Sequence, residues 1–156
     1  MAEIVISVDA VSRSKTRAEV SARDLVFNVD EPERLGGSNT GPNPTELVLG
    51  ALAGCFNVLG HMVAKEMGFE ITSLKMHLAG TLDPLSYLGK KPTVRPGYKE
   101  IVVGMDVETS ATPEQLEEWA RAVEARCPVS DNIEHDTPVK IDISTAGERP
   151  KAISEH

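Results

Sequence analysis

The feature that most constrains the fold is the uncharged stretch from Leu47 to Ala64. Its length reaches the lower limit for a helix that spans a bilayer. The stretch also contains three glycines, Asn57 and His61, and it lacks flanking aromatic belts, while Lys65 supplies a basic flank at one end only. We therefore expect a helix that is buried in a soluble core or in a subunit interface, and we expect no membrane partner.

Capping signals predict where this helix begins and ends. Pro44 suits the first helical position, and Asn43 before it can cap the helix. Gly68 is a natural stop, so the helix is expected to run to Met67. A helix that is apolar nearly all round is typical of a central position in a core.

A second helix is predicted by the same order of residues in Thr112-Pro113-Glu114-Gln115. The residues that follow are apolar at helical spacing on one side and charged on the other, which is typical of an amphipathic helix. Because Pro128 disfavours helical backbone in the residue before it, this helix is expected to end at Cys127.

Six segments have the composition or the alternation of β-strands: residues 4–8, 17–20, 25–29, 70–80, 98–107 and 139–143. Together with the two helices they predict an α+β fold in which the helices pack on sheet faces. Residues 1–146 are expected to form one domain, and 147–156 a polar C-terminal tail.

The charge and the cysteine count exclude several classes of protein. The net charge is −8 and the pI is about 5.0, so nucleic acid and anionic membranes are unfavourable partners. Two cysteines cannot build a disulfide-dense secreted scaffold or an all-thiolate zinc site. The N-terminal residues lack the pattern of a signal peptide, so we expect a cytoplasmic protein.

Cys55 and Cys127 are the candidate reactive residues. Each can be a small buried hydrophobic residue, but each also lies where a helix faces or leaves the core, so folding could bring the two sulfurs together. A thiol pair suits peroxide reduction, because one thiolate becomes a sulfenic acid and the second thiol condenses with it to a disulfide. The attacking thiolate needs a cation nearby, since the dipole of its helix fades within the first turn.

Two histidines, His61 and His135, are additional candidate site residues. His61 can be a core histidine with one hydrogen-bond partner or a catalytic residue, and His135 can be a solvated loop residue or part of a site. No two residues among these histidines and the cysteines have the spacing of zinc ligands, so we expect no metal and no other bound cofactor.

Two separated motifs resemble the signatures of one family. They are Gly41-Pro42-Asn43-Pro44-Thr45-Glu46-Leu47 followed by Gly50-Ala51-Leu52-Ala53-Gly54-Cys55, and, after the second helix, Cys127-Pro128-Val129. Leu35-Gly36-Gly37 also fits. These motifs resemble the OsmC/Ohr superfamily, which comprises the osmotically inducible protein C and the organic hydroperoxide resistance proteins. The resemblance spans about residues 17–144.

The resemblance implies an OsmC-like fold, with antiparallel sheets packed on two main helices, in an intertwined homodimer. It implies a cysteine-based peroxidase that acts in oxidative-stress defence and reduces organic hydroperoxides. Carried over by motif, Cys55 attacks the peroxide and Cys127 resolves the sulfenic acid, and an external dithiol reductant then resets the pair.

The family also activates its first cysteine with an arginine and a glutamate. We expect Arg17 to stabilise the thiolate, with Arg13, Arg23 and Arg34 as alternatives. Glu46 is either an orienting residue or half of a capping box, because it stands one position later than the family's glutamate.

Two other functions remain open at this point. The same cavity could bind a small apolar ligand with little turnover. A Cys55–Cys127 disulfide could also act as a redox sensor that changes the binding of a partner.

Overall fold

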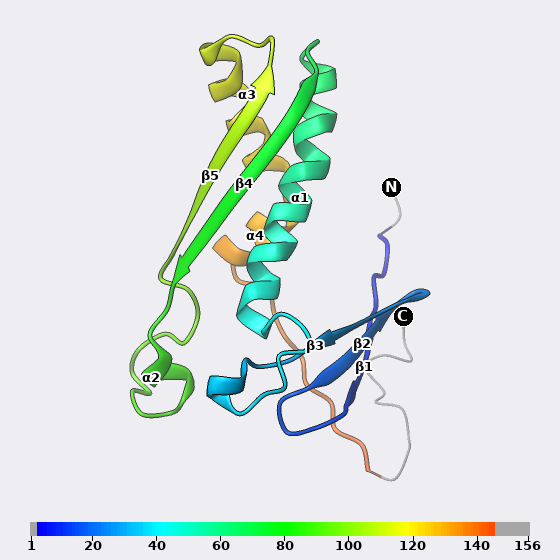
Figure 1. The fold of residues 1–156 in the computed structure, drawn as a ribbon, viewed down its shortest axis with the longest axis vertical. Helices are drawn as coiled ribbons and strands as arrows, with labels where there is room; N and C mark the ends of the chain where they lie inside the picture. Colours follow the sequence, from blue (N-terminus) through cyan, green and yellow to red (C-terminus); the bar gives the residue numbers. More distant parts are fainter. Residues whose placement is uncertain (1–2, 146–156) are drawn as a thin grey trace. The chain divides into compact units, whose positions relative to one another are not determined.

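The computed structural model describes residues 3–145. The elements follow in the order β1 (Asp9–Ser12), β2 (Ala18–Ala22), β3 (Leu25–Val29), η1 (Glu33–Leu35), α1 (Pro44–Glu66), β4 (Ile71–Thr81), α2 (Pro84–Tyr87), β5 (Glu100–Thr109), α3 (Pro113–Arg126) and α4 (Pro128–Glu134) (Figure 1). The α+β prediction is confirmed, as are both predicted helices and four of the predicted strands.

The described chain divides into two compact units, one of residues 3–44 with 135–145 and one of residues 45–134. The expectation of one domain over residues 1–146 stays a prediction. The predicted tail at 147–156 lies outside the described residues.

The first unit contains an antiparallel meander in the order β1-β2-β3. Two strand predictions for this unit are wrong: residues 4–8 and 139–143 form no strand, and β1 begins only at Asp9. Both segments alternate, but their apolar side chains are exposed, Ile6 by 84% and Ile141 by 83%. The alternation is a signal for one buried face, and a strand forms only where a neighbour supplies hydrogen bonds and a surface to bury that face.

Asp30 organises the loop that follows β3. Its buried carboxylate accepts hydrogen bonds from the backbone N–H groups of Glu31, Ser38 and Thr40 and from the Thr40 hydroxyl. Burial by itself raises the pKa of Asp30, but hydrogen bonds from Thr40, from the Thr16 side chain and from Glu31 outweigh it and lower the pKa to about 2. The loop is therefore folded around one ionised side chain.

Two glycines of the same loop lie against backbone. A Cβ atom on Gly37 would collide with the carbonyl of Glu31, and one on Gly41 would collide with the carbonyl of Asn28. Only glycine fits these positions, because a backbone obstacle cannot rotate away as a side chain can.

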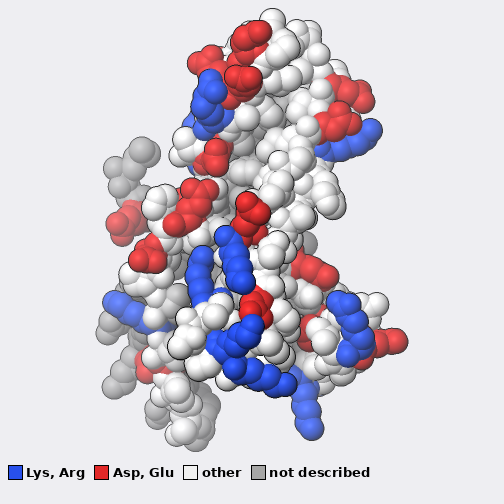
Figure 2. Space-filling model, turned by 90° about the vertical axis from the view of Figure 1, so that its left-hand side faces the viewer, with Lys and Arg blue, Asp and Glu red and all other residues white. Residues whose placement is uncertain are grey.

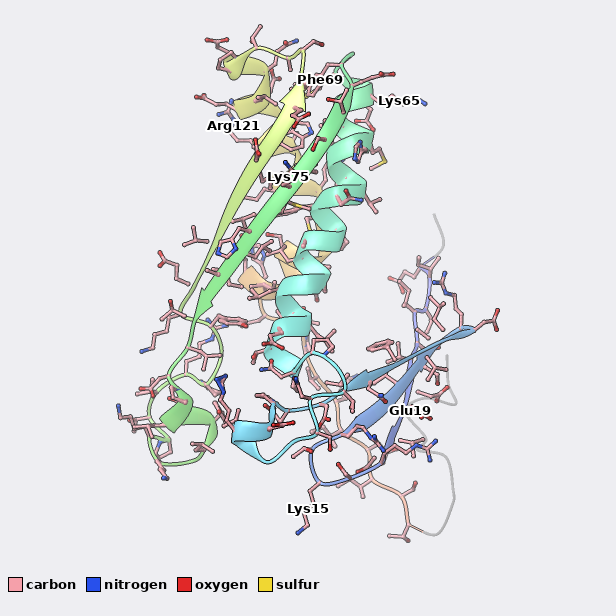
Figure 3. The ribbon with its side chains drawn as sticks, viewed as in Figure 1. Lys15, Glu19, Lys65, Phe69, Lys75 and Arg121 are labelled. Carbon is pink, nitrogen blue, oxygen red and sulfur yellow. The ribbon has the colours of Figure 1, made fainter. Side chains whose placement is uncertain are left out.

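The second unit is built on a long antiparallel ladder of β4 and β5. The inward side chains of the ladder include Leu74, Met76, Val103 and Met105, and they pack against a core formed by α1 and α3. Figure 1 shows α1 running alongside the ladder with α3 and α4 behind it, and Figure 3 labels Phe69 where the chain passes from α1 into β4. On the outward side charged residues such as Lys75, Asp106 and Glu108 lie among uncharged ones, and both signs of charge are present on the face in Figure 2.

Helix α1 is buried along one side only. Leu52, Phe56, Leu59 and Val63 form the buried stripe, at the spacing of successive helical turns. Length and composition alone would allow α1 to cross a membrane, as they would for many core helices of soluble proteins. Its buried stripe makes it a core helix of the second unit.

Helix α3 is fixed to α1 at two places. The buried Trp119 donates its indole N–H to the carbonyl of Gly60 at 2.8 Å, and its ring lies where a side chain at Gly60 would be. Near the ends of the two helices, Arg126 donates to both carboxylate oxygens of Glu66, at 2.5 and 3.2 Å. The capping box predicted for α3 is present in both directions between Thr112 and Gln115.

We predict that Asp30→Asn destabilises the protein at neutral pH and reduces its sensitivity to acid. Because the folded pKa is about 2 and the ordinary value is 3.8, the unfolded chain binds the proton more tightly. The contribution of Asp30 is therefore complete above about pH 4 and is lost as the pH falls toward 2. Urea unfolding at pH 7 and between pH 2 and 4 measures this effect. The exposed Asp24→Asn is the matched control, and equal behaviour of the two variants would contradict the assignment.

Candidate functional site

The two cysteines continue the buried stripes of the helices that carry them. Cys55 lies three residues after Leu52 and four before Leu59, so it faces the side of α1 that packs on the core. Cys127 follows Trp119 and Val123 at intervals of four residues, at the end of α3. Because both stripes meet in one core, residues that are far apart in the sequence become neighbours.

The sulfur atoms are in direct contact. Cys127 Sγ donates to Cys55 Sγ across 2.7 Å, and both residues are free cysteines. A disulfide needs the sulfurs at about 2.05 Å, so the pair can be joined without rearranging the helices. The predicted meeting of Cys55 and Cys127 is therefore present in the folded chain.

The two thiols differ in exposure. Cys127 is 2% exposed, whereas Cys55 is only partly buried. Burial and the hydrogen bond to Cys55 raise the pKa of the Cys127 thiol, and the backbone N–H groups of Ser130 and Val129 oppose them in part. Cys127 therefore stays protonated at neutral pH, and Cys55 is the more exposed of the two thiols.

Cys127 also connects two helices. Its N–H bonds to the carbonyl of Glu124 and closes α3, and its carbonyl accepts from Asp131 at the start of α4. Its sulfur accepts a hydrogen bond from the N–H of Ser130 at 3.3 Å, which is the bond that an N-cap side chain makes. The position of this sulfur is thus set by backbone on both sides.

Ser130 and helix α4 are features that the sequence analysis missed. The Ser130 side chain is buried and donates to Glu134 at 2.8 Å, one helical turn later. Pro128 directly after a residue that can cap is a helix-start signal, and it could have revealed α4.

The other predicted site residues lie elsewhere. Arg17 belongs to the first unit, and its buried Nε has no hydrogen-bond partner among the described residues. Glu46 is exposed in the first turn of α1, nine residues before Cys55, so it is about 13 Å away along the axis and about 180° around the helix. The structure does not bring Glu46 beside Cys55 within one chain, and the roles of Arg17 and Glu46 stay predictions.

Both candidate histidines are exposed. His61 lies on the outer side of α1, and His135 follows the last residue of α4. Among residues 3–145 no group of three or more His, Cys, Asp or Glu side chains is placed to hold a metal ion.

A family model described as OsmC-like protein matches residues 37–142, a span that includes both cysteines. The chain belongs to the OsmC-like protein family. A comparison with curated proteins finds no match.

Solved structures share the fold of this OsmC-like protein. The OsmC-like protein from Mycoplasma pneumoniae superposes with a TM-score of 0.73 at 18% sequence identity, covering 85% of this chain and 89% of the other. The organic hydroperoxide resistance protein OhrB of Bacillus subtilis gives 0.55 at 25% identity over 83% and 90% of the two chains. An organic hydroperoxide resistance protein OsmC from Legionella pneumophila gives 0.60 at 19% identity over 85% and 91%. These likenesses confirm the predicted OsmC-like fold.

We predict that alkylation distinguishes the two thiols. Iodoacetamide at pH 7 should modify Cys55 about tenfold or more faster than Cys127, because Cys127 is buried and its pKa is raised. Peptide mass mapping over time measures both rates in one sample. Unfolding in urea should make the rates equal, and faster modification of Cys127 in the folded protein would contradict the assignment.

Proposed function

We propose that this OsmC-like protein is a thiol peroxidase that reduces organic hydroperoxides in oxidative-stress defence, in the cytoplasm. The observation that carries the proposal is the 2.7 Å contact between Cys55 and Cys127 inside an apolar core. Membership of the family supports it, as do the names of solved relatives called organic hydroperoxide resistance proteins.

The reaction has two steps in the protein. The Cys55 thiolate attacks the terminal peroxide oxygen, the O–O bond breaks, and the alkoxide takes up a proton and leaves as an alcohol while Cys55 becomes a sulfenic acid. The Cys127 sulfur then attacks the Cys55 sulfur. An S–S bond forms, and hydroxide leaves with the proton from the Cys127 thiol as water.

An external dithiol must return two electrons to the disulfide after each turnover. It does so by thiol–disulfide exchange, which leaves the protein as two thiols and the reductant as a disulfide. No bound cofactor takes part in this scheme.

The assignment of roles follows from burial. Cys55 is partly exposed and can meet a substrate, whereas Cys127 is nearly inaccessible and can meet only Cys55. Apolar neighbours such as Leu52, Phe56 and Val129 surround the pair and favour an organic peroxide over hydrogen peroxide.

For Arg17 we propose the stabilisation of the Cys55 thiolate. A guanidinium with a buried, unsatisfied Nε has a donor available for an anion, and the family resemblance assigns an arginine to this task. Glu46 is proposed as the orienting carboxylate of this arginine.

Peroxide consumption with cumene hydroperoxide and dithiothreitol tests the proposal. Cys55→Ser should fall to the uncatalysed background. Cys127→Ser should complete one oxidation per chain, and its sulfenate should be trapped by dimedone, because the attacking sulfur remains and the resolving sulfur is gone. Arg17→Met should slow the first oxidation by about 10–100-fold, the loss expected for a hydrogen bond to a charged group.

Equal slow rates for the wild type and Cys55→Ser would reject the peroxidase. In that case binding of a small apolar ligand without turnover becomes the better account. An exposed variant on α3, Arg121→Met, is the control for nonspecific effects of removing a cation.

We also propose that a second copy of the chain covers the exposed side of α1, as the family resemblance implies. Val58 is 66% exposed and Met62 41%, and a Cβ on Gly50 or Gly54 would meet open space. An apolar helix face with two small residues one turn apart fits a close approach of the same face on a partner. Residues 4–8 and 139–143, which alternate in sequence but form no strand, are further segments with which a second chain could form a sheet.

Val58→Lys should therefore shift the protein from dimer to monomer, because a charge in the centre of an apolar interface is costly to bury. Analytical ultracentrifugation measures the mass. Ala125→Lys adds the same charge at an exposed position of α3 and should leave the dimer intact. A monomeric wild type would reject the dimer.

A further inference from the structure

The hydrogen bonds around Cys127 indicate that this residue has a role before it attacks the sulfenic acid of Cys55. Its sulfur accepts a hydrogen bond from the N–H of Ser130 at 3.3 Å, and it donates to Cys55 Sγ at 2.7 Å. The backbone amide can only donate to this sulfur, so it does not compete for the thiol hydrogen, which is free to point at Cys55.

We propose that the Cys127 thiol is the hydrogen-bond donor that keeps Cys55 ionised before a peroxide arrives. The proposal rests on the assignment of Cys55 as the reactive sulfur, and it gives Cys127 a second role in the same cycle. A hydrogen bond to a charged acceptor is stronger than one to a neutral acceptor, so this donor favours the thiolate of Cys55 over its thiol.

The fold holds the donor in place. Cys127 closes α3 and begins α4, so its backbone is fixed by helices on both sides. Ser130 is itself anchored, because its hydroxyl donates to Glu134 at 2.8 Å and its side chain is buried. Ser130 thus acts as a positioning residue, which aims the Cys127 sulfur through the backbone amide.

The donor is also protected from losing its proton. Cys127 is 2% exposed, and the apolar neighbours Trp119 and Val123 precede it on α3. A buried thiol beside a thiolate does not ionise readily, because two adjacent negative charges in an apolar core are unfavourable. Cys127 therefore keeps its proton and remains a hydrogen-bond donor.

Two variants of Cys127 test the proposal, and neither can form a disulfide. Cys127→Ser keeps a hydroxyl donor, and Cys127→Ala removes the donor. The probe is iodoacetamide, whose reaction rate with Cys55 is followed by peptide mass mapping as the pH is varied. In Cys127→Ala the midpoint of this pH–rate profile should shift upward by about one pH unit, a tenfold loss of thiolate below it. In Cys127→Ser the midpoint should stay close to that of the wild type.

Comparing the two variants shows whether Cys127 acts as a hydrogen-bond donor or only through its packing. A buried hydroxyl is at least as disturbing to an apolar core as a missing sulfur, so loss of packing would affect Cys127→Ser as much as Cys127→Ala. Urea unfolding measures the stabilities of both variants. A midpoint of the pH–rate profile that follows the loss of stability, and not the loss of the donor, would indicate a packing role.

Overlapping pH–rate profiles for the wild type and Cys127→Ala would overturn the proposal, and so would equal shifts in both variants. The measurement uses no peroxide. A failed peroxidase assay and a failed donor role are therefore distinguishable outcomes.

Discussion

The contact between two sulfur atoms depends on how α1 is held against α3. Trp119 fixes the middle of α1 through the Gly60 carbonyl, and the Arg126–Glu66 ion pair joins the helices near their ends. The sulfurs come from residues at the margin of this packed seam, Cys55 on the first helix and Cys127 after the second. Because side chains in a close-packed core have little freedom, the seam sets the separation of the sulfurs as firmly as it sets that of its apolar neighbours.

The location of the pair follows from the meeting of three elements. Helix α3 ends at Arg126 and α4 begins at Pro128, so the chain turns at Cys127, where the sulfur must face α1. The amide of Ser130 is exposed to the sulfur by this turn, since the first N–H groups of a helix have no partner within it. A cysteine one turn earlier, within α3, would lack this contact.

Local sequence signals predicted the elements of the second unit well. The capping residues of α3 and the glycine after α1 act through neighbouring backbone, so their effect is visible in a short window. Residues 4–8 and 139–143 show the limit of such signals, because alternation states which side should be buried and is silent about the chain that buries it. The proximity of Cys55 and Cys127 was predictable as a possibility from their stripes and their motifs. The distance between the two sulfur atoms was not predictable, because it depends on how α1 and α3 cross, and a short stretch of sequence does not determine that crossing.

Because the two thiols are unequally buried, the hydrogen bond between them has a defined donor. If both sulfurs were equally exposed, either could ionise, and the hydrogen bond between them could point either way. Burial raises the pKa of Cys127 and so keeps the proton on that sulfur. In the proposed cycle, the same burial keeps peroxide away from Cys127 until Cys55 has reacted. Under the proposed function, this one asymmetry in packing decides which thiol donates, which attacks and in what order they act.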